Sequence, residues 1–227
     1  MDTVAPRTLK PATHQLDEEV LAAYSAGTMP EALSLVIAAQ ASICPQTRER
    51  LRELDAIGGG LMALGETREM ALGSFEATLK KIAEQGQEAR EARPDPAEAP
   101  CDVLPAPVRR YVGGGLDAVR WRNIGMGAHQ AILHETRDSS VRLLRIPAGT
   151  ALPDHGHKGI EMTLVLQGAF VDGHERFARG DVELADETME HHPIADVNEE
   201  CVCLVACEGR LKFSSLIPRL AQPFLRI

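Results

Sequence analysis

The segment GTALPDHGHKGIEMTLVLQG, residues 149–168, constrains the fold more than any other part of this chain. It carries His155, His157 and Glu161, and a further histidine, His191, follows later in the sequence. Side chains two residues apart in a strand share one face, so the first two histidines can both point inward. Three imidazoles and one carboxylate suit zinc, iron, nickel, copper or manganese better than calcium or magnesium. The spacing therefore predicts a cage for one divalent transition metal ion, with zinc as the first choice.

The same segment resembles the first motif of the cupin family at every required position. The second cupin motif is matched at its two ends, by Gly180 and His191, whereas Asp186 and Thr188 replace its proline and second glycine. The turn residues thus depart from the family pattern while the metal-ligand position is kept. The resemblance implies a small β-barrel, the double-stranded β-helix or jelly roll of cupins, with four metal ligands: His155, His157, Glu161 and His191.

Charge and composition exclude several classes of protein. The chain has 33 acidic against 24 basic residues and a net charge of −9, which argues against non-specific binding to nucleic acid. No leader sequence is recognisable at the start, and no apolar run approaches the roughly 20 residues that span a bilayer. We therefore expect a cytoplasmic protein. Its five cysteines show no disulfide-framework spacing, and reduced thiols are expected.

Apolar residues recur at helical spacing through the first part of the chain and predict four helices. Gly27 is expected to end the first helix, while Pro30 and Pro45 are expected to open the second and third. Three consecutive glycines, 58–60, are expected to interrupt the third helix. The fourth helix is expected over residues 66–85.

The rest of the chain changes character twice. Residues 86–107 are rich in proline, alanine and glutamate, a composition typical of an exposed, flexible linker. From residue 108 onward, short branched-aliphatic runs separated by turns predict strands. The predicted fold class is therefore α+β and multidomain. It comprises a helical domain over residues 1–85, a linker over 86–107 and a cupin domain over 108–227.

With both halves placed, the chain resembles the ChrR-type anti-sigma factors over most of its length. The segments LAAYSAGTMPEALSLVIAAQ and RELDAIGGGLM carry the resemblance in the helical half, and LPAPVRRYVGGGLDAVRWR and GDVELADETMEHHP carry it in the cupin half. The resemblance implies that the helical domain holds an extracytoplasmic-function (ECF) sigma factor inactive. It also implies that the metal-binding cupin domain tunes release in response to an oxidative signal. No direct contact with nucleic acid or a membrane is expected, and the oligomeric state is not defined.

The helical half departs from the family at its zinc site. The family's H-x3-C-x2-C motif falls here on Gln40, Cys44 and Thr47, and the first histidine of the site is replaced by Gln15, with His14 beside it. Structural zinc favours four nitrogen or sulfur ligands in a closed site. We therefore expect no zinc in this half, with helix packing in its place, whereas the cupin ligands are all kept.

Two other functions compete with the anti-sigma hypothesis. A cupin metal with open coordination positions suits a metalloenzyme such as an iron-dependent dioxygenase, and a stand-alone sensor of another protein partner is the third possibility. The helical half discriminates between them, because an enzyme has no need of its family-like segments. Cys201 and Cys203 invite a redox interpretation, but residues two apart in a strand are poorly placed for a relaxed disulfide. Two buried free thiols are expected.

Overall fold

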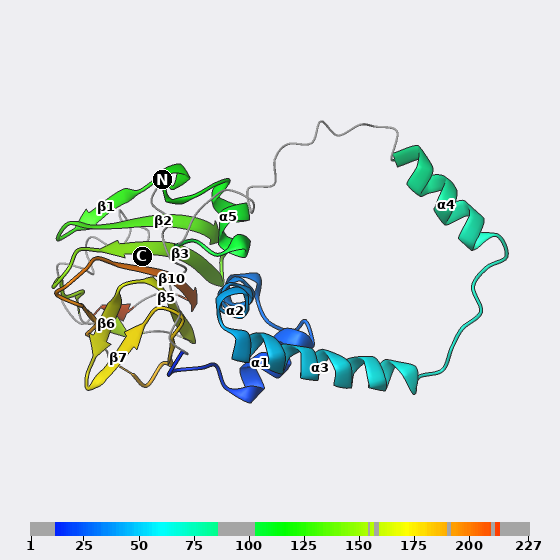
Figure 1. The fold of residues 1–227 in the computed structure, drawn as a ribbon, viewed down its shortest axis with the longest axis horizontal. Helices are drawn as coiled ribbons and strands as arrows, with labels where there is room; N and C mark the ends of the chain where they lie inside the picture. The colour runs from blue at the N-terminus through cyan, green and yellow to red at the C-terminus, as the bar shows by residue number, and fades with distance from the viewer. Residues whose placement is uncertain are drawn as a thin grey trace, which may run out of the picture.

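Helices form the N-terminal part of the protein, and antiparallel strands form the rest (Figure 1). The computed structural model describes residues 12–85, 103–153, 155–156, 159–189, 192–209 and 212–213. The helices within these ranges are α1 (Glu18–Ser25), α2 (Glu31–Ile43), α3 (Pro45–Ala63), α4 (Ser74–Gln85), α5 (Ala106–Val112) and the 3-10 helix η2 (Leu116–Ala118).

The residues predicted to end the first helix and to begin the second and third are confirmed. The predicted interruption of the third helix and the predicted start of the fourth are wrong. Gly27 follows α1 with φ of +70°, Pro30 caps α2, and Pro45 opens α3. The glycines at 58–60 do not interrupt α3, which runs on to Ala63. A glycine in a helix costs only about 1 kcal/mol relative to alanine, which a long helix can absorb. The sequence predicts that the fourth helix begins at residue 66, but residues 66–73 are not helical and α4 begins at Ser74.

The strands form antiparallel sheets. The largest has the order β1-β2-β3-β10-β5-β8, a second has the order β7-β6-β9, and β4 pairs with β11. Their bounds are β1 (Arg122–Gly125), β2 (Ala128–Glu135), β3 (Ser139–Ile146), β4 (His155–Gly156), β5 (Glu161–Gln167), β6 (Ala169–Asp172), β7 (Glu175–Ala178), β8 (Val182–Ala185), β9 (Ile194–Ala195), β10 (Cys201–Glu208) and β11 (Lys212–Phe213).

Strand β10 lies inside the large sheet and is buried on both faces. Its odd-numbered residues, such as Cys203 and Val205, cluster with Phe170 and Phe177 of the smaller sheet and form the interior of the barrel. Its even-numbered residues, such as Leu204, belong to a second core that includes the helices. The two-residue repeat of a strand thus separates two cores, and it explains why the run CVCLVAC is apolar without a break.

Helix α2 covers the outer face of the large sheet (Figure 1). It contacts β3, β5 and β10 on one side and α1, α3 and α5 on the others. Leu33, Val36, Ile37 and Ala39 are all fully buried, as expected for a helix that is apolar all round. A further link joins α2 to α5, because the Tyr111 hydroxyl donates to Glu31 across 2.5 Å. This bond, and burial after it, raise the pKa of the Tyr111 phenol to about 12.

These observations confirm the predicted fold class, a helical part joined to a cupin-like antiparallel barrel. The predicted domain boundaries at residues 85 and 108 stay a prediction. The packing adds a contact that the sequence did not indicate, since α2 and the large sheet share one hydrophobic core. The helical part and the barrel are therefore expected to unfold together.

The shared core can be tested with Ile37→Ala. Removing a fully buried isoleucine side chain is expected to lower the free energy of unfolding by about 2–5 kcal/mol. Trp121, the single tryptophan, packs against the shared core from the β half, so its fluorescence reports on that half during urea unfolding. Far-ultraviolet circular dichroism reports on the helices in the same titration.

Both signals are expected to shift to lower urea by the same amount. The exposed Leu61→Ala in α3 is the matched control and should change stability by less than about 0.5 kcal/mol. A shift in the helical signal alone, with Trp121 unchanged, would show that the two parts do not share a cooperative core.

Candidate metal centre and protein-binding surface

Glu161 begins β5 and points into the barrel, where only 4% of its surface is exposed. Both of its carboxylate oxygens accept hydrogen bonds from neighbouring side chains. The Cys207 thiol donates to Oε2 across 2.8 Å, and the Thr163 hydroxyl donates to Oε1 across 3.3 Å. These two contacts fix the orientation of the carboxylate, as outer-shell partners of metal ligands commonly do. A buried, oriented carboxylate fits the predicted role of Glu161 as a metal ligand.

The three predicted histidine ligands cannot be compared with Glu161 in the same way. The backbone of His155 lies in β4, where it pairs with Phe213 of β11. His157 and His191 lie outside the described residues. Among the described residues, no group of three or more His, Cys, Asp or Glu side chains is placed to hold a metal ion. The four-residue set therefore stays a prediction, and any ion bound there would be held by His155, His157, Glu161 and His191.

The barrel interior near Glu161 holds further polar residues that the sequence analysis did not single out. Arg142 is 6% exposed, and its guanidinium donates to Gln130 Oε1 across 3.2 Å and to Ser140 Oγ across 2.8 Å. Glu183, also 6% exposed, stands opposite Thr163 in the β5–β8 pairing. A signal for Arg142 was present in the sequence, because it alternates with Val141 and Leu143 of the other core. A charge on the inward face of a predicted strand indicates a polar interior.

The cysteines of β10 are free thiols, as the sequence analysis predicted. Cys201, Cys203 and Cys207 are all buried. The sulfurs of the first two lie 3.4 Å apart in hydrogen-bonding contact. That contact, followed by burial, raises the pKa of the Cys203 thiol well above its ordinary value. Burial, followed by the charge of Glu161, raises the pKa of Cys207. Cys101 lies outside the described residues.

The residues in the family's N-terminal zinc register make hydrogen bonds to one another and to the barrel. Gln40 is fully buried; its Nε2 donates to the Gly180 carbonyl across 3.2 Å, and its Oε1 accepts from the Thr47 hydroxyl across 3.2 Å. The Cys44 thiol donates instead to Gln46 across 3.3 Å. These amide and hydroxyl groups are poor zinc ligands. The expectation that this half holds no zinc stays a prediction.

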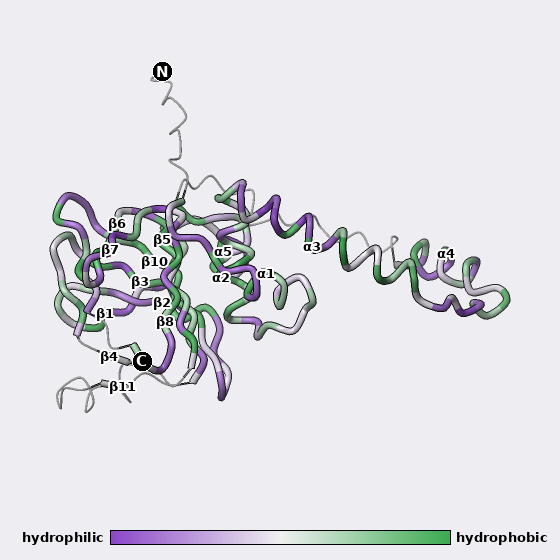
Figure 2. The backbone as a smooth tube through the Cα atoms, turned by 90° about the horizontal axis from the view of Figure 1, so that it is seen from below, coloured by the Kyte–Doolittle hydropathy of each residue, from purple (hydrophilic) through white to green (hydrophobic). Residues whose placement is uncertain are grey.

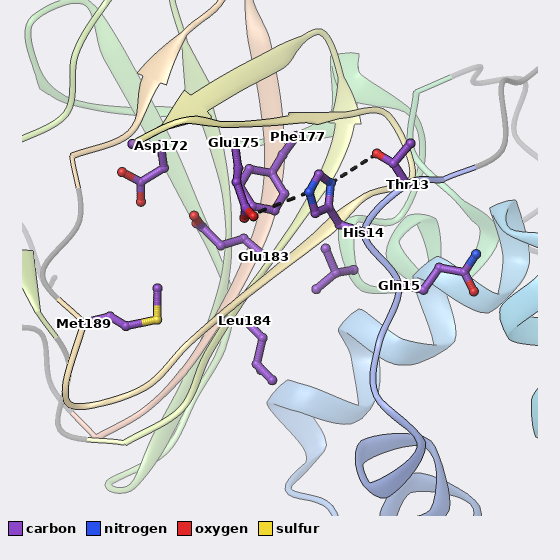
Figure 3. Close-up of a pocket in the computed structure, with 11 residues that line it drawn as sticks. Thr13, His14, Gln15, Asp172, Glu175, Phe177, Glu183, Leu184 and Met189 are labelled. Atoms are coloured by element: carbon purple, nitrogen blue, oxygen red, sulfur yellow. Dashed lines mark hydrogen bonds and ion pairs between the residues drawn. The ribbon is translucent and has the colours of Figure 1, made fainter.

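His14, the other residue considered for that zinc site, lies against the barrel. Its ring packs on Phe177 with ring centroids 4.4 Å apart and lies 4.0 Å from the Glu175 carboxylate (Figure 3). It helps to line a cavity of about 580 Å³ between the N-terminal segment and the barrel. The other side chains that shape this cavity include Thr13, Asp172, Glu175, Glu183, Leu184 and Met189 (Figure 3).

An exposed apolar surface lies on the second half of α3, the segment after it and α4. Helix α4 stands apart from the barrel (Figure 1), and apolar and polar segments alternate along α3 and α4 (Figure 2). In α4 the apolar residues Phe75, Leu79 and Ile82 are 50–67% exposed and recur at helical spacing. We define the helical face as the exposed set Ile57, Leu61, Met62, Leu64, Met70, Leu72, Phe75, Leu79 and Ile82.

Large apolar side chains exposed in this number are the kind of surface that marks a candidate protein-interaction site. The helical face lies away from the barrel and from the predicted metal centre, so the molecule carries two separate candidate sites. None of the helices in the described residues combines the length and apolar character that a membrane span requires.

Comparison with known proteins shows which family this chain resembles over nearly its whole length. A protein family described as the ChrR cupin-like domain matches residues 112–210. Anti-sigma-E factor ChrR of Cereibacter sphaeroides (strain ATCC 17023) is 47% identical over 216 residues, which span 94% of this chain and 98% of that protein. A chain in the crystal structure of Rhodobacter sphaeroides SigE in complex with the anti-sigma ChrR is 43% identical, with a TM-score of 0.71, over 86% of this chain and 98% of that one. An RmlC-like cupin protein of Ralstonia eutropha JMP134 is 18% identical, with a TM-score of 0.40, over 45% of this chain and 71% of that one.

The fold and sites define a cupin protein that carries a helical protein-binding part. The near full-length match adds the particular family: the chain belongs to the ChrR family of anti-sigma factors. The predicted resemblance is therefore confirmed.

The metal centre can be tested by metal analysis of protein purified without chelator. We expect about one equivalent of a divalent transition ion per chain, zinc first, and its loss in His157→Ala and His191→Ala. Cys207→Ala removes the donor to Glu161 and is expected to weaken metal affinity about tenfold, the lower end of outer-shell effects. The exposed His174→Ala is the matched control and should keep the wild-type metal content. Unchanged metal content in both His→Ala ligand variants would contradict the assignment.

Proposed function

We propose that this protein is an anti-sigma factor that binds an ECF sigma factor through its helical part and holds it inactive. The observation that carries the proposal is the match, over nearly the whole of both chains, to Anti-sigma-E factor ChrR. A ChrR chain that is 43% identical to this chain is seen in complex with the sigma factor SigE. Inhibition would proceed by masking, because a bound helical part would cover the surface that the sigma factor needs for core RNA polymerase.

The helical face supplies the kind of contact that this function needs. Its apolar residues are exposed although similar residues elsewhere are buried; Leu72 is fully exposed and Phe75 is 67% exposed. Buried apolar and aromatic anchors carry most of the binding energy at protein interfaces. Since α4 stands apart from the other described helices and strands (Figure 1), a partner that covers this face would remove its apolar side chains from water.

The charge of this protein indicates which charge the partner's surface carries. The net charge of −9 favours a partner with a basic surface. Such complementarity mainly accelerates association, and its influence falls as salt rises. We therefore assign affinity to the apolar anchors and association rate to the acidic residues.

The proposal gives the cupin part a sensing role. Its metal centre, zinc first and iron, nickel or manganese next, would be held by the four predicted ligands, and it would supply a charged, ligand-exchanging site in the barrel. Three buried thiols line the same interior, and one of them contacts Glu161. We propose an oxidative signal as the input from the family resemblance alone, because burial and the raised pKa values of Cys203 and Cys207 keep these thiols protonated and weakly reactive. A sigma factor acts on RNA polymerase in the cytoplasm, so we place the protein there.

This assignment makes the protein a regulator and not an enzyme. A cupin metalloenzyme, such as an iron-dependent dioxygenase, is the alternative. An enzymatic function would not explain why the apolar residues of the helical face are exposed. The anti-sigma function assigns a role to both the helical face and the barrel. Binding of the sigma factor therefore decides between the two.

The interface can be tested with the double variant Leu79→Asp, Ile82→Asp in α4. Placing charges at two apolar anchors is expected to weaken sigma-factor binding at least about thirtyfold, the equivalent of about 2 kcal/mol. Both positions are at least half exposed, so the fold and its unfolding temperature should stay as in wild type. Isothermal titration calorimetry with a purified ECF sigma factor from the same genome measures the effect.

Lys80→Gln, Lys81→Gln is the matched control. It alters two neighbouring residues of α4 outside the apolar stripe and also makes the protein more acidic, so binding should change by less than about threefold. If the aspartate variant binds as tightly as wild type, α4 is not part of the interface.

A further inference from the structure

Helix α2 and the segment before α1 both form hydrogen bonds to the same turn of the barrel. The turn joins β7 to β8 and contains Gly180 and Asp181. The buried Gln40 of α2 donates to the Gly180 carbonyl across 3.2 Å. The Asp181 carboxylate accepts from the backbone N–H of Thr13 across 2.6 Å and of His14 across 3.0 Å. A backbone bond from Val182 N–H to the His14 carbonyl, 3.1 Å long, completes the contact.

The amide of Gln40 is satisfied only when both parts are in place. One end needs the Gly180 carbonyl of the barrel, and the other end receives the Thr47 hydroxyl of α3. Gln40 is fully buried and Thr47 is 2% exposed, so water does not replace either bond. Leaving a buried polar group without its partner costs more than a typical hydrogen bond contributes. Separation of α2 from the turn therefore carries a direct penalty.

The turn itself is rigid and leads directly into the barrel interior. Gly180 has φ of +95°, a conformation that favours glycine, and Asp181 closes the turn by accepting from the Ala178 N–H across 2.8 Å. Two residues after Asp181, Glu183 points into the barrel opposite Thr163. The Thr163 hydroxyl in turn contacts Glu161, the predicted metal ligand. A short stretch of β8 thus connects the metal centre to the helical half.

We propose that Gln40, Thr47 and Asp181 form a metal-free clasp that couples the barrel to the helical half. Gln40 and Thr47 occupy the register in which the family places zinc ligands, and here Gln40 donates a hydrogen bond to the β7–β8 turn, which contains Asp181. Displacement of β8 then disturbs α2 and, through Thr47, α3, which carries the start of the helical face. The regulatory consequence rests on the proposed anti-sigma function, whereas the coupling does not.

Hydrogen exchange of the full-length protein, read by mass spectrometry, tests the coupling directly. Gln40→Met keeps the side-chain length and removes both hydrogen bonds. Peptides covering residues 178–185 are expected to exchange at least about fivefold faster than in wild type, the lower end of the effect of an unsatisfied buried group. Peptides covering β2, on the far side of the large sheet, should exchange at the wild-type rate.

Thr47→Val provides a milder variant that leaves the bond to Gly180 in place, and it should produce a smaller increase at 178–185. Gln46→Met, at an exposed neighbouring position, is the matched control and should produce none. An unchanged rate at 178–185 in Gln40→Met overturns the clasp. An equal increase in β2 also overturns it, because Gln40 would then stabilise the whole fold without specific coupling.

The same samples separate this inference from the proposed function. Faster exchange at 178–185 supports the clasp whether or not wild-type protein binds the sigma factor. Absence of sigma-factor binding in wild type contradicts the anti-sigma function and leaves the clasp standing.

Discussion

The burial of α2 between the other helices and the large sheet is the contact on which the rest of the structure depends. The helix presents Leu33, Val36, Ile37 and Ala39 to a core that both halves share. It carries a single fully buried amide, Gln40, which is bonded in both directions. The apolar residues supply the stabilisation, and the amide fixes how the helix sits on the barrel. The two candidate sites lie on either side of this contact.

This arrangement explains how one chain can hold a partner and respond to a signal. The helical face extends from α3 and α4, which have few contacts with the barrel, so a protein can cover it without disturbing the fold. The predicted metal centre lies inside the barrel, where Glu161 is held by Cys207 and Thr163. Among the described residues, a change at that centre can reach α2 through the large sheet and through the β7–β8 turn, because both contact α2.

Much of this could be predicted from the sequence because several signals are local. Pro30, Pro45 and Gly27 act within one or two residues, so they placed the helix ends correctly. The glycines at 58–60 predict an interruption that α3 does not have, because a helix tolerates glycine at a modest cost. The cupin family could be recognised because metal-ligand spacing is a sequence property.

Contacts between distant segments left weaker signals. Gln40 reads as a lost zinc ligand in the sequence, and only the fold shows that it meets a carbonyl 140 residues away. The sequence analysis did not single out Arg142 and Glu183, because the face that a strand residue occupies depends on the register of pairing with its neighbours. The exposed residues of α4 matched the pattern of a core helix, and a pattern alone cannot tell a core face from a face that a partner covers.

The most direct test of the central claim is competition for the sigma factor. Core RNA polymerase is mixed with the ECF sigma factor that binds this protein, and the full-length protein is titrated in. Holoenzyme formation is measured by native gel or by transcription from the sigma-dependent promoter. If the protein is an anti-sigma factor, the amount of holoenzyme falls in proportion to added protein and is abolished near one protein per sigma factor. Undiminished holoenzyme at a large excess of protein, with the protein folded and metal-loaded, would contradict this function.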